Sequence, residues 1–170
     1  FDVTVPSTVA GVLYDEGALG TDLLEGLNYY NADKSVFDTP WTYRTEFDVE
    51  IVEGQNYDLI FNGLNYYADI VLNDVCIASS DTTYGVFIRR EYNVTDLLKK
   101  NNTLEVKIRR AQSGDLNIGF VDWNPRPADE SMGIFRPVWL RYSDAVSLKD
   151  PAVRSKVDTA DFKEAWLTVE

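Results

Sequence analysis

An acidic residue and an indole are neighbours in the segment Asp122-Trp123-Asn124-Pro125. A carboxylate can accept hydrogen bonds from two sugar hydroxyls, and an indole can pack on a sugar ring or form a wall of its pocket. The amide of Asn124 could add a further polar contact. This loop is therefore our candidate sugar-binding site. In the alternative interpretation, Trp123 is buried in the core and Asp122 only caps a turn.

Side chains for the common hydrolytic mechanisms are scarce. The sequence has no histidine and a single cysteine, which excludes a Ser-His-Asp set, a Cys-His set and an imidazole metal site within it. Cys76 lies in the apolar run 75–78, so we expect a packed thiol. The acid pairs Asp15-Glu16 and Asp129-Glu130 are expected to be solvated turn charges, and Arg126 could pair with Asp129 at the surface. No cofactor or metal site is predicted, although a bound cation stays possible.

The composition limits the possible partners. The formal net charge is −12, from 16 Lys and Arg against 28 Asp and Glu, whereas nucleic-acid binders usually carry the opposite balance. No apolar run approaches the roughly 20 residues that span a bilayer. The ten Tyr, eight Phe and four Trp suit half-buried strands and also suit sugar faces. We therefore expect neither a nucleic acid nor a membrane as a partner.

The elements that would position these residues are mostly strands. From Trp41 to Ile51, apolar and polar residues alternate with a period of two, which indicates a half-buried strand. Further strands are predicted at 57–62, 67–72, 75–79, 87–92, 104–109 and 138–142. Short strands with turns between them indicate an all-β sandwich or barrel.

The first forty residues differ from this pattern. Val9, Val12 and Leu13 share one face of a predicted short helix, which Ser7 can cap and Gly17 can end. Residues 18–40 have no steady period, and connections of that length are often functional. A similar cap, from Thr95, is expected for a helical turn at 96–100.

The pattern also changes near the other end. Residues 149–151, Lys-Asp-Pro, have the composition of a linker, and 152–170 would form one further hairpin. Because a lone hairpin is only marginally stable in water, these residues predict the first strands of a second domain.

Six segments in order resemble the N-terminal sugar-binding domain of glycoside hydrolase family 2. In the strand pair ending at Asn73-Asp74, Asp74 stands where that family usually has Gly, and the last segment is similar to the family's Gly-Ile-Trp/Phe-Arg motif. The segments are 5–9, 41–47, 63–74, 92–98, 102–106 and 133–140.

The resemblance implies an antiparallel jelly-roll β-sandwich of the galactose-binding-domain type over 1–148, with a short N-terminal helix. It implies that 149–170 are the linker and first strands of an immunoglobulin-like second domain. The Asp-Trp-Asn-Pro loop is most similar to the β-mannosidase and exo-β-glucosaminidase branch, while a β-galactosidase or β-glucuronidase type stays open. By analogy, a periplasmic or secreted location fits this substrate class.

The same resemblance implies that the catalytic residues of the parent protein lie in another domain. Two catalytic Glu of the family lie in a C-terminal TIM barrel, one of them in an Asn-Glu pair, and this sequence has neither barrel nor pair. The chain alone should therefore be inactive. Its expected partners are a β-linked oligosaccharide or glycoside and the C-terminal domains of the same chain.

Individual residues also gain expected roles from the resemblance. Asp122 and Trp123 would complete the subsite for the non-reducing sugar of an exo-acting retaining β-glycosidase. Asn28 lies in a loop that approaches the active site in related enzymes. For Arg136 we expect a structural role, pairing or hydrogen bonding at the domain boundary, rather than a sugar contact. Two other functions stay open: a stand-alone carbohydrate-binding module and a purely structural accessory domain.

Overall fold

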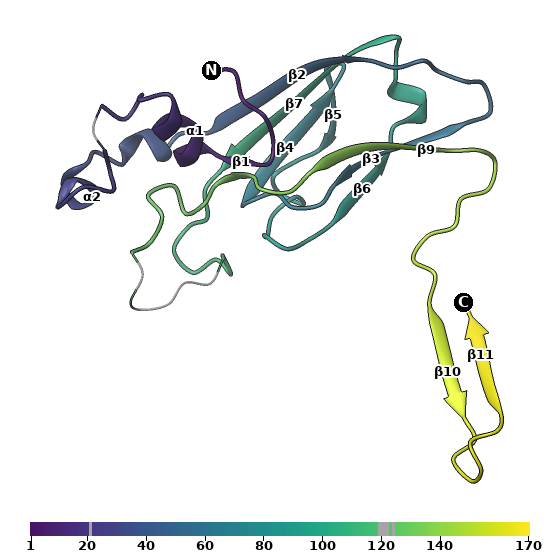
Figure 1. Ribbon diagram of the computed structural model, residues 1–170. Helices are drawn as coiled ribbons and strands as arrows, with labels where there is room; N and C mark the ends of the chain where they lie inside the picture. Colours follow the sequence, from purple (N-terminus) through teal and green to yellow (C-terminus); the bar gives the residue numbers. More distant parts are fainter. Residues whose placement is uncertain (21, 119–122, 124) are drawn as a thin grey trace.

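The computed structural model describes residues 1–20, 22–118, 123 and 125–170 (Figure 1). The helices are α1 (Val9–Asp15) and α2 (Asn28–Asn31), and single 3-10 turns lie at Ser35–Phe37 and Thr95–Leu97. The strands are β1 (Ser7–Thr8), β2 (Trp41–Asp48), β3 (Asn56–Phe61), β4 (Tyr67–Leu72), β5 (Val75–Ala78), β6 (Arg90–Asn93), β7 (Asn101–Arg109), β8 (Gly133–Ile134), β9 (Val138–Ser143), β10 (Val153–Val157) and β11 (Ala165–Val169).

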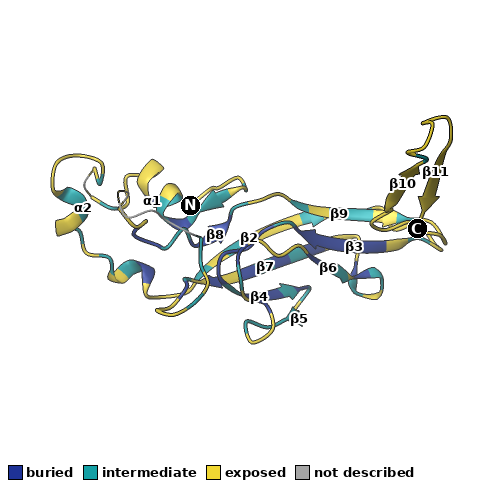
Figure 2. Cartoon of the chain, turned by 90° about the horizontal axis from the view of Figure 1, so that it is seen from below, coloured by how far each residue is buried: buried dark blue, intermediate teal, exposed yellow. Residues whose placement is uncertain are grey.

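Two antiparallel sheets form a sandwich, as the sequence predicts. One sheet has the order β2-β7-β4-β5 and the other the order β6-β3-β9, while β1 and β8 form a short separate pair. The two sheets lie face to face, with the buried residues between them (Figure 2). Fully buried side chains include Phe61 on one sheet and Ile70 and Ile108 on the other.

The alternating pattern explains how each strand faces this core. In β7, Leu104, Val106 and Ile108 are buried, and the residues between them face outward. In β2, Trp41, Tyr43 and Phe47 are half-buried, as predicted, but Thr45 is exposed. The predicted strand at 87–92 begins only at Arg90.

The helix caps expected from the sequence are wrong in detail. Thr8, not Ser7, caps α1: its Oγ1 accepts a hydrogen bond from the Gly11 amide at 3.2 Å. Thr8 directly precedes Val9, the first residue of α1, and so occupies the N-cap position, whereas Ser7 lies one residue farther from the helix. Thr95 also does not cap a helix, since its Oγ1 accepts a hydrogen bond from the Tyr57 amide at 2.9 Å.

Cys76 is exposed, so the expectation of a packed thiol is wrong. β5 is an edge strand that pairs only with β4 among the described residues, and its register shifts at Ile70 and Val71. An apolar run on an edge strand need not be covered by the core, and Val75 is exposed beside the cysteine.

After β9 the chain leaves the sandwich and reaches the hairpin of β10 and β11 (Figure 1). The two strands pair in register from Val153↔Val169 to Val157↔Ala165, and every residue of both strands is exposed. Lys149 holds the connecting segment against the sandwich through ion pairs with Glu91 and, at 3.5 Å, with Asp58. Within the described part of the chain, no helix has the length and apolar character needed to cross a membrane.

Candidate functional site

The candidate site lies in the connection between β7 and β8, which contains the Asp-Trp-Asn-Pro segment. Asp122 and Asn124 lie outside the described residues. The indole of Trp123 is 81% exposed. The interpretation of Trp123 as a buried core residue is therefore wrong, and its ring is available to a ligand or to another domain.

The long connection at 18–40, which both its length and the family resemblance indicated as a functional loop, contacts this segment. The hydroxyl of Tyr29, in α2, donates a hydrogen bond to the carbonyl of Arg126. The ammonium of Lys34 lies 4.5 Å from the centre of the Tyr29 ring. Desolvation, followed by the charge of Glu130, raises the pKa of Tyr29, so this phenol stays protonated and able to donate.

Asn28 is half-buried at the start of α2, beside Tyr29. Its Nδ2 donates a hydrogen bond to the carbonyl of Asp22 at 2.8 Å, which shapes the loop leading into α2. Its part in sugar binding stays a prediction.

The acidic pair that follows Trp123 is not a pair of solvated turn charges. Asp129 is 1% exposed. Its Oδ2 accepts a hydrogen bond from the Ala10 amide of α1, and its Oδ1 accepts one from the Ser131 amide, both at 2.8 Å. Burial raises the pKa of Asp129, and the backbone hydrogen bonds act in the opposite direction. Through these two hydrogen bonds, the Asp129 carboxyl connects the segment after the candidate loop to α1.

Arg126 pairs with Glu130 rather than with Asp129. Its Nη2 lies 3.4 Å from Glu130 Oε2, and the Asn117 amide donates to the same oxygen at 3.2 Å. Arg126 cannot pair with Asp129 at the surface because that carboxyl points inward to backbone amides. Glu130 and Ser131 both have left-handed backbone conformations, with φ of 54° and 57°.

Sequence reasoning missed Asn65, which holds this turn from the connection between β3 and β4. Asn65 is completely buried, and its backbone exchanges hydrogen bonds with that of Gly133 at 2.9 and 2.7 Å. Its Nδ2 donates to the carbonyls of Glu130 and Ser131, each at 2.8 Å. Its Oδ1 has no hydrogen-bond partner among the described residues. Asn65 lies between two predicted strands, 57–62 and 67–72, and nothing in a single sequence shows which residues of such a connection are buried.

Arg136 lies on an aromatic patch next to the site. Its guanidinium is 5.6 Å from the ring centres of both Phe87 and Phe135, and these two rings meet edge to face at 5.8 Å. Gly63 lies beneath them, and a Cβ there would lie 2.7 Å from the Phe135 ring, so a larger residue would displace that ring. Arg136 thus packs on rings at the surface, and its expected role at a domain boundary stays a prediction.

The described part of the site suits binding better than acid-base chemistry. Glycoside hydrolysis needs two carboxyl groups on either side of the scissile bond. Asp129 is occupied by backbone amides, and Glu130 is occupied by Arg126 and Asn117. What the site offers a ligand is an exposed indole in a loop held firmly at its base.

Comparisons with known proteins identify the family of the chain. The profile of the glycosyl hydrolase 2 galactose-binding domain-like family matches residues 1–118. An exo-β-D-glucosaminidase of Hypocrea jecorina is 32% identical over 155 residues, which are 89% of this chain and 17% of that protein.

Two solved structures extend the comparison. The exo-chitosanase of Amycolatopsis orientalis, in complex with PNP-β-D-glucosamine, matches with a TM-score of 0.85 and 31% identity, over 98% of this chain and 20% of its own. A β-D-mannosidase from Dictyoglomus thermophilum matches with a TM-score of 0.68 and 25% identity, over 92% of this chain and 22% of its own. The chain thus spans about a fifth or less of the length of each of these proteins.

Proposed function

The chain belongs to the glycosyl hydrolase 2 galactose-binding domain-like family, and we propose that it is the N-terminal domain of an exo-acting retaining β-glycosidase. In this proposal the domain supplies one side of the pocket for the non-reducing sugar. The parent enzyme removes a β-linked glucosamine or mannose residue, with the glucosaminide as the first candidate. The similarity to an exo-β-D-glucosaminidase and an exo-chitosanase supports that order.

The observation that carries the proposal is the exposure of the Trp123 indole, at 81%. An exposed indole that follows a carboxylate in the sequence is suited to the apolar face and the hydroxyls of a sugar. Asp122 is proposed as the carboxylate that accepts hydrogen bonds from two hydroxyls, with Asn124 and Asn28 as further contacts.

The loop can serve this purpose because its base is fixed. The buried Asp129 carboxyl and the Asn65 amide hold the residues that follow Trp123, and the Tyr29 hydroxyl holds Arg126. Because residues 126–131 are already ordered, they lose little conformational entropy when a ligand binds.

The catalytic carboxylates are proposed to lie in another domain of the parent chain. Residues 149–170 would be the linker and first strands of an immunoglobulin-like second domain, and the exposed hairpin of β10 and β11 fits that assignment. The ion pairs of Lys149 would set the direction in which the second domain begins.

The test is Asp122→Ala in the full-length enzyme with p-nitrophenyl β-D-glucosaminide and p-nitrophenyl β-D-mannoside. Loss of two charge-assisted hydrogen bonds, each about 1.5–3 kcal/mol, should lower kcat/KM by roughly 100-fold or more. Asp15→Ala, which removes an exposed carboxylate at the end of α1, is the matched control and should leave kcat/KM unchanged. Near-normal activity in a folded Asp122→Ala enzyme would contradict the proposal.

Titration calorimetry of residues 1–170 with chito-oligosaccharides separates this proposal from an independent binding module. A domain that supplies only part of a pocket should show no binding at micromolar concentrations. Micromolar affinity in the isolated chain would favour the module instead.

A further inference from the structure

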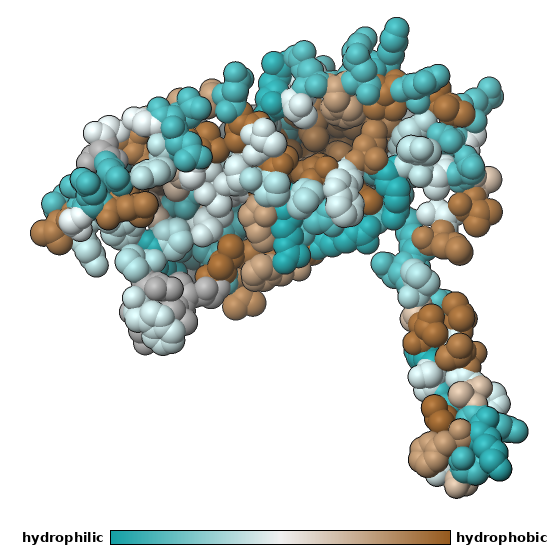
Figure 3. Space-filling view, viewed as in Figure 1, coloured by the Kyte–Doolittle hydropathy of each residue, from teal (hydrophilic) through white to brown (hydrophobic). Residues whose placement is uncertain are grey.

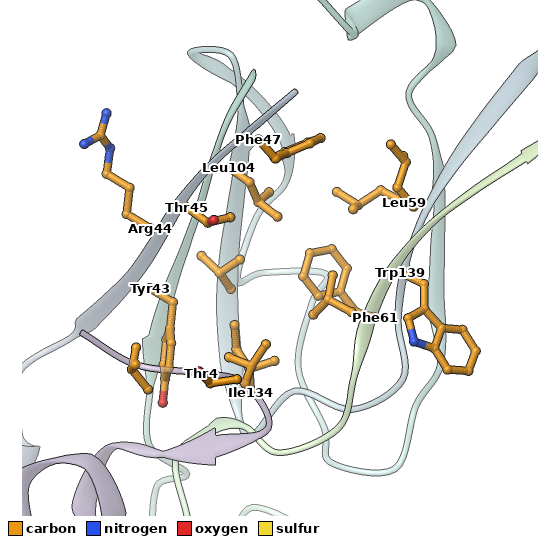
Figure 4. A pocket seen from close by; sticks show the side chains of 15 residues that line it. Thr4, Tyr43, Arg44, Thr45, Phe47, Leu59, Phe61, Leu104, Ile134 and Trp139 are labelled. Atoms are coloured by element: carbon orange, nitrogen blue, oxygen red, sulfur yellow. The ribbon is translucent and has the colours of Figure 1, made fainter. Parts of the chain in front are cut away.

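The groove between the two sheets is separate from the described part of the candidate loop. It encloses about 390 Å³. Figure 3 shows apolar side chains at the bottom of this hollow, and Figure 4 shows them pointing into it from both sheets. None of the described residues that line it belongs to the connection between β7 and β8. The side chains that hold the candidate loop therefore lie elsewhere in the sandwich.

The start of β4 contacts the chain on both sides of Trp123. Asn65 contacts the segment that follows Trp123, residues 126–131, through two backbone carbonyls. Tyr67 lies two residues after Asn65 and contacts the segment that precedes Trp123, residues 112–118. The Tyr67 hydroxyl donates to the carboxylate of Asp115, with both carboxylate oxygens at 2.9 Å. One short stretch of backbone thus holds both segments.

The Asp115 carboxylate connects Tyr67 to the turn at 112–115. Its Oδ2 also accepts a hydrogen bond from the Gln112 amide at 2.6 Å, and the Asp115 amide donates to the Gln112 carbonyl at 3.1 Å. Hydrogen bonds to an ionised group are stronger than those between neutral groups. The turn is therefore bound to β4 by a strong contact rather than by packing alone.

Tyr67 is itself held in place by the sheet. It is the first residue of β4 and pairs with Arg109 of β7, whose guanidinium lies 5.2 Å from the centre of the Tyr67 ring. Its ring meets the ring of Tyr66 edge to face at 4.9 Å. The hydrogen bond to Asp115, followed by burial, raises the pKa of Tyr67, so the hydroxyl stays protonated and able to donate.

Two more contacts hold the chain between Asp115 and Trp123. Asn117 donates to the Glu130 carbonyl at 3.3 Å and so joins the two segments directly. Ile118 packs against a small apolar cluster that includes the buried Tyr66, the neighbour of Tyr67. The chain is thus fixed at several points shortly before it reaches the exposed indole.

We propose that Tyr67 is a positioning residue for the sugar-binding loop: through Asp115 it fixes the segment before Trp123, as Asn65 fixes the segment after it. The proposal rests on the proposed function, because it concerns the same sugar pocket. Tyr67 acts through the loop and contacts no sugar. Doubling the length of a flexible segment lowers the population of one ordered arrangement about threefold, so an effect of at least this size is expected when the anchor is lost.

Hydrogen exchange in the full-length enzyme tests whether Tyr67 holds the loop. Tyr84→Phe is the matched control, because the Tyr84 ring lies 6.2 Å from that of Tyr67 and its hydroxyl makes no hydrogen bond among the described residues. Peptides that contain Trp123 should exchange roughly threefold faster or more in Tyr67→Phe than in Tyr84→Phe. Equal exchange rates in the two variants would overturn the proposal.

A thermodynamic cycle separates positioning from a general structural role. Tyr67→Phe should lower kcat/KM on p-nitrophenyl β-D-glucosaminide roughly threefold or more in the wild type. In Asp122→Ala/Trp123→Ala, which lacks the proposed sugar contacts, the same change should cost less than about twofold. Equal losses in the two backgrounds would contradict the proposal. Near-normal activity of Asp122→Ala/Trp123→Ala itself would overturn the proposed function, and the exchange comparison would still decide whether Tyr67 holds the loop.

Substitutions of the acceptor give an independent test. Asp115→Ala removes both oxygens, whereas Asp115→Asn keeps one that can accept from Tyr67. Exchange of the peptides that contain Trp123 should be fastest in Asp115→Ala and intermediate in Asp115→Asn. The same exchange rate in Asp115→Ala and the wild type would overturn the proposal.

Discussion

Asp129→Ala is the substitution whose effect follows most directly from the structure. The carboxyl of Asp129 is 1% exposed and accepts hydrogen bonds from the Ala10 and Ser131 amides, both at 2.8 Å. One of these amides belongs to the first turn of α1, and the other belongs to the turn that follows the candidate loop. Alanine would leave both amides without their acceptor.

The expected loss is about 2–3 kcal/mol of unfolding free energy. A buried donor left without a partner costs about 1–3 kcal/mol, and we take the lower part of that range for each amide because both bonds are only partly buried. The desolvation that raises the pKa of Asp129 also reduces what its charge contributes. With a typical urea m-value of about 1–3 kcal/mol per molar, the midpoint should fall by roughly 1–2 M.

The assay is urea denaturation of residues 1–170, followed by far-ultraviolet circular dichroism. Asp129→Asn keeps the shape but offers one acceptor oxygen, so it should recover at most about half of the loss. Asp15→Ala removes the same charge from an exposed position in α1 and should change the free energy by less than about 0.5 kcal/mol. The reasoning is refuted if Asp129→Ala costs no more than Asp15→Ala.

Three further outcomes are expected. Ile108→Ala, at a completely buried position of β7, should cost about 2–5 kcal/mol in the same urea assay, and a cost below 1 kcal/mol would mean that the core is not packed around it. Burial favours the protonated form of Asp58, but the hydrogen bond from Arg141, at 2.7 Å, and the charges of Lys149 and Arg141 outweigh it and lower the pKa. The stabilising effect of the Asp58 carboxylate is therefore full above the ordinary pKa of about 4 and is lost as the pH falls through the lowered pKa. Between about pH 5 and pH 2, the urea midpoint should fall more steeply in the wild type than in Asp58→Asn. Parallel plots of urea midpoint against pH for the two proteins would contradict this prediction. The Cys76 thiol should react completely with Ellman's reagent without denaturant, whereas a thiol that reacts only after unfolding would show that β5 is covered.

The main features of the fold could be predicted from the sequence because they follow from local alternation. The period-two pattern places Leu104, Val106 and Ile108 of β7 toward the core, and in β2 it does so for Trp41, Tyr43 and Phe47 but not for Thr45. The six family-like segments, each short, predict the family together, and the comparison confirms that prediction.

Burial of single polar residues could not be predicted in the same way. Asp129-Glu130 has the composition of an exposed turn, yet Asp129 is buried because α1 packs against it from a distant part of the sequence. Cys76 has an apolar neighbourhood in the sequence and is exposed because β5 is the last strand of its sheet. Both outcomes depend on contacts between distant segments, which a local pattern does not contain.

In the candidate site, too, a local sequence feature could be predicted and a contact between distant segments could not. The sequence identified the loop with Trp123, and the structure shows the ring exposed. The sequence did not identify Asn65, whose amide holds the turn after that loop through the carbonyls of Glu130 and Ser131.

The central claim is that this domain contributes a sugar-binding ring to the pocket of a glycosidase, and Trp123→Ala in the full-length enzyme tests it most directly. Because the indole is exposed, the melting temperature should stay within about 1 °C, whereas kcat/KM on p-nitrophenyl β-D-glucosaminide should fall at least tenfold, or about 1.4 kcal/mol. Trp123→Phe keeps a flat apolar ring and should recover part of the activity. Unchanged kcat/KM in Trp123→Ala, or a loss of stability that accounts for the loss of activity, would contradict the claim.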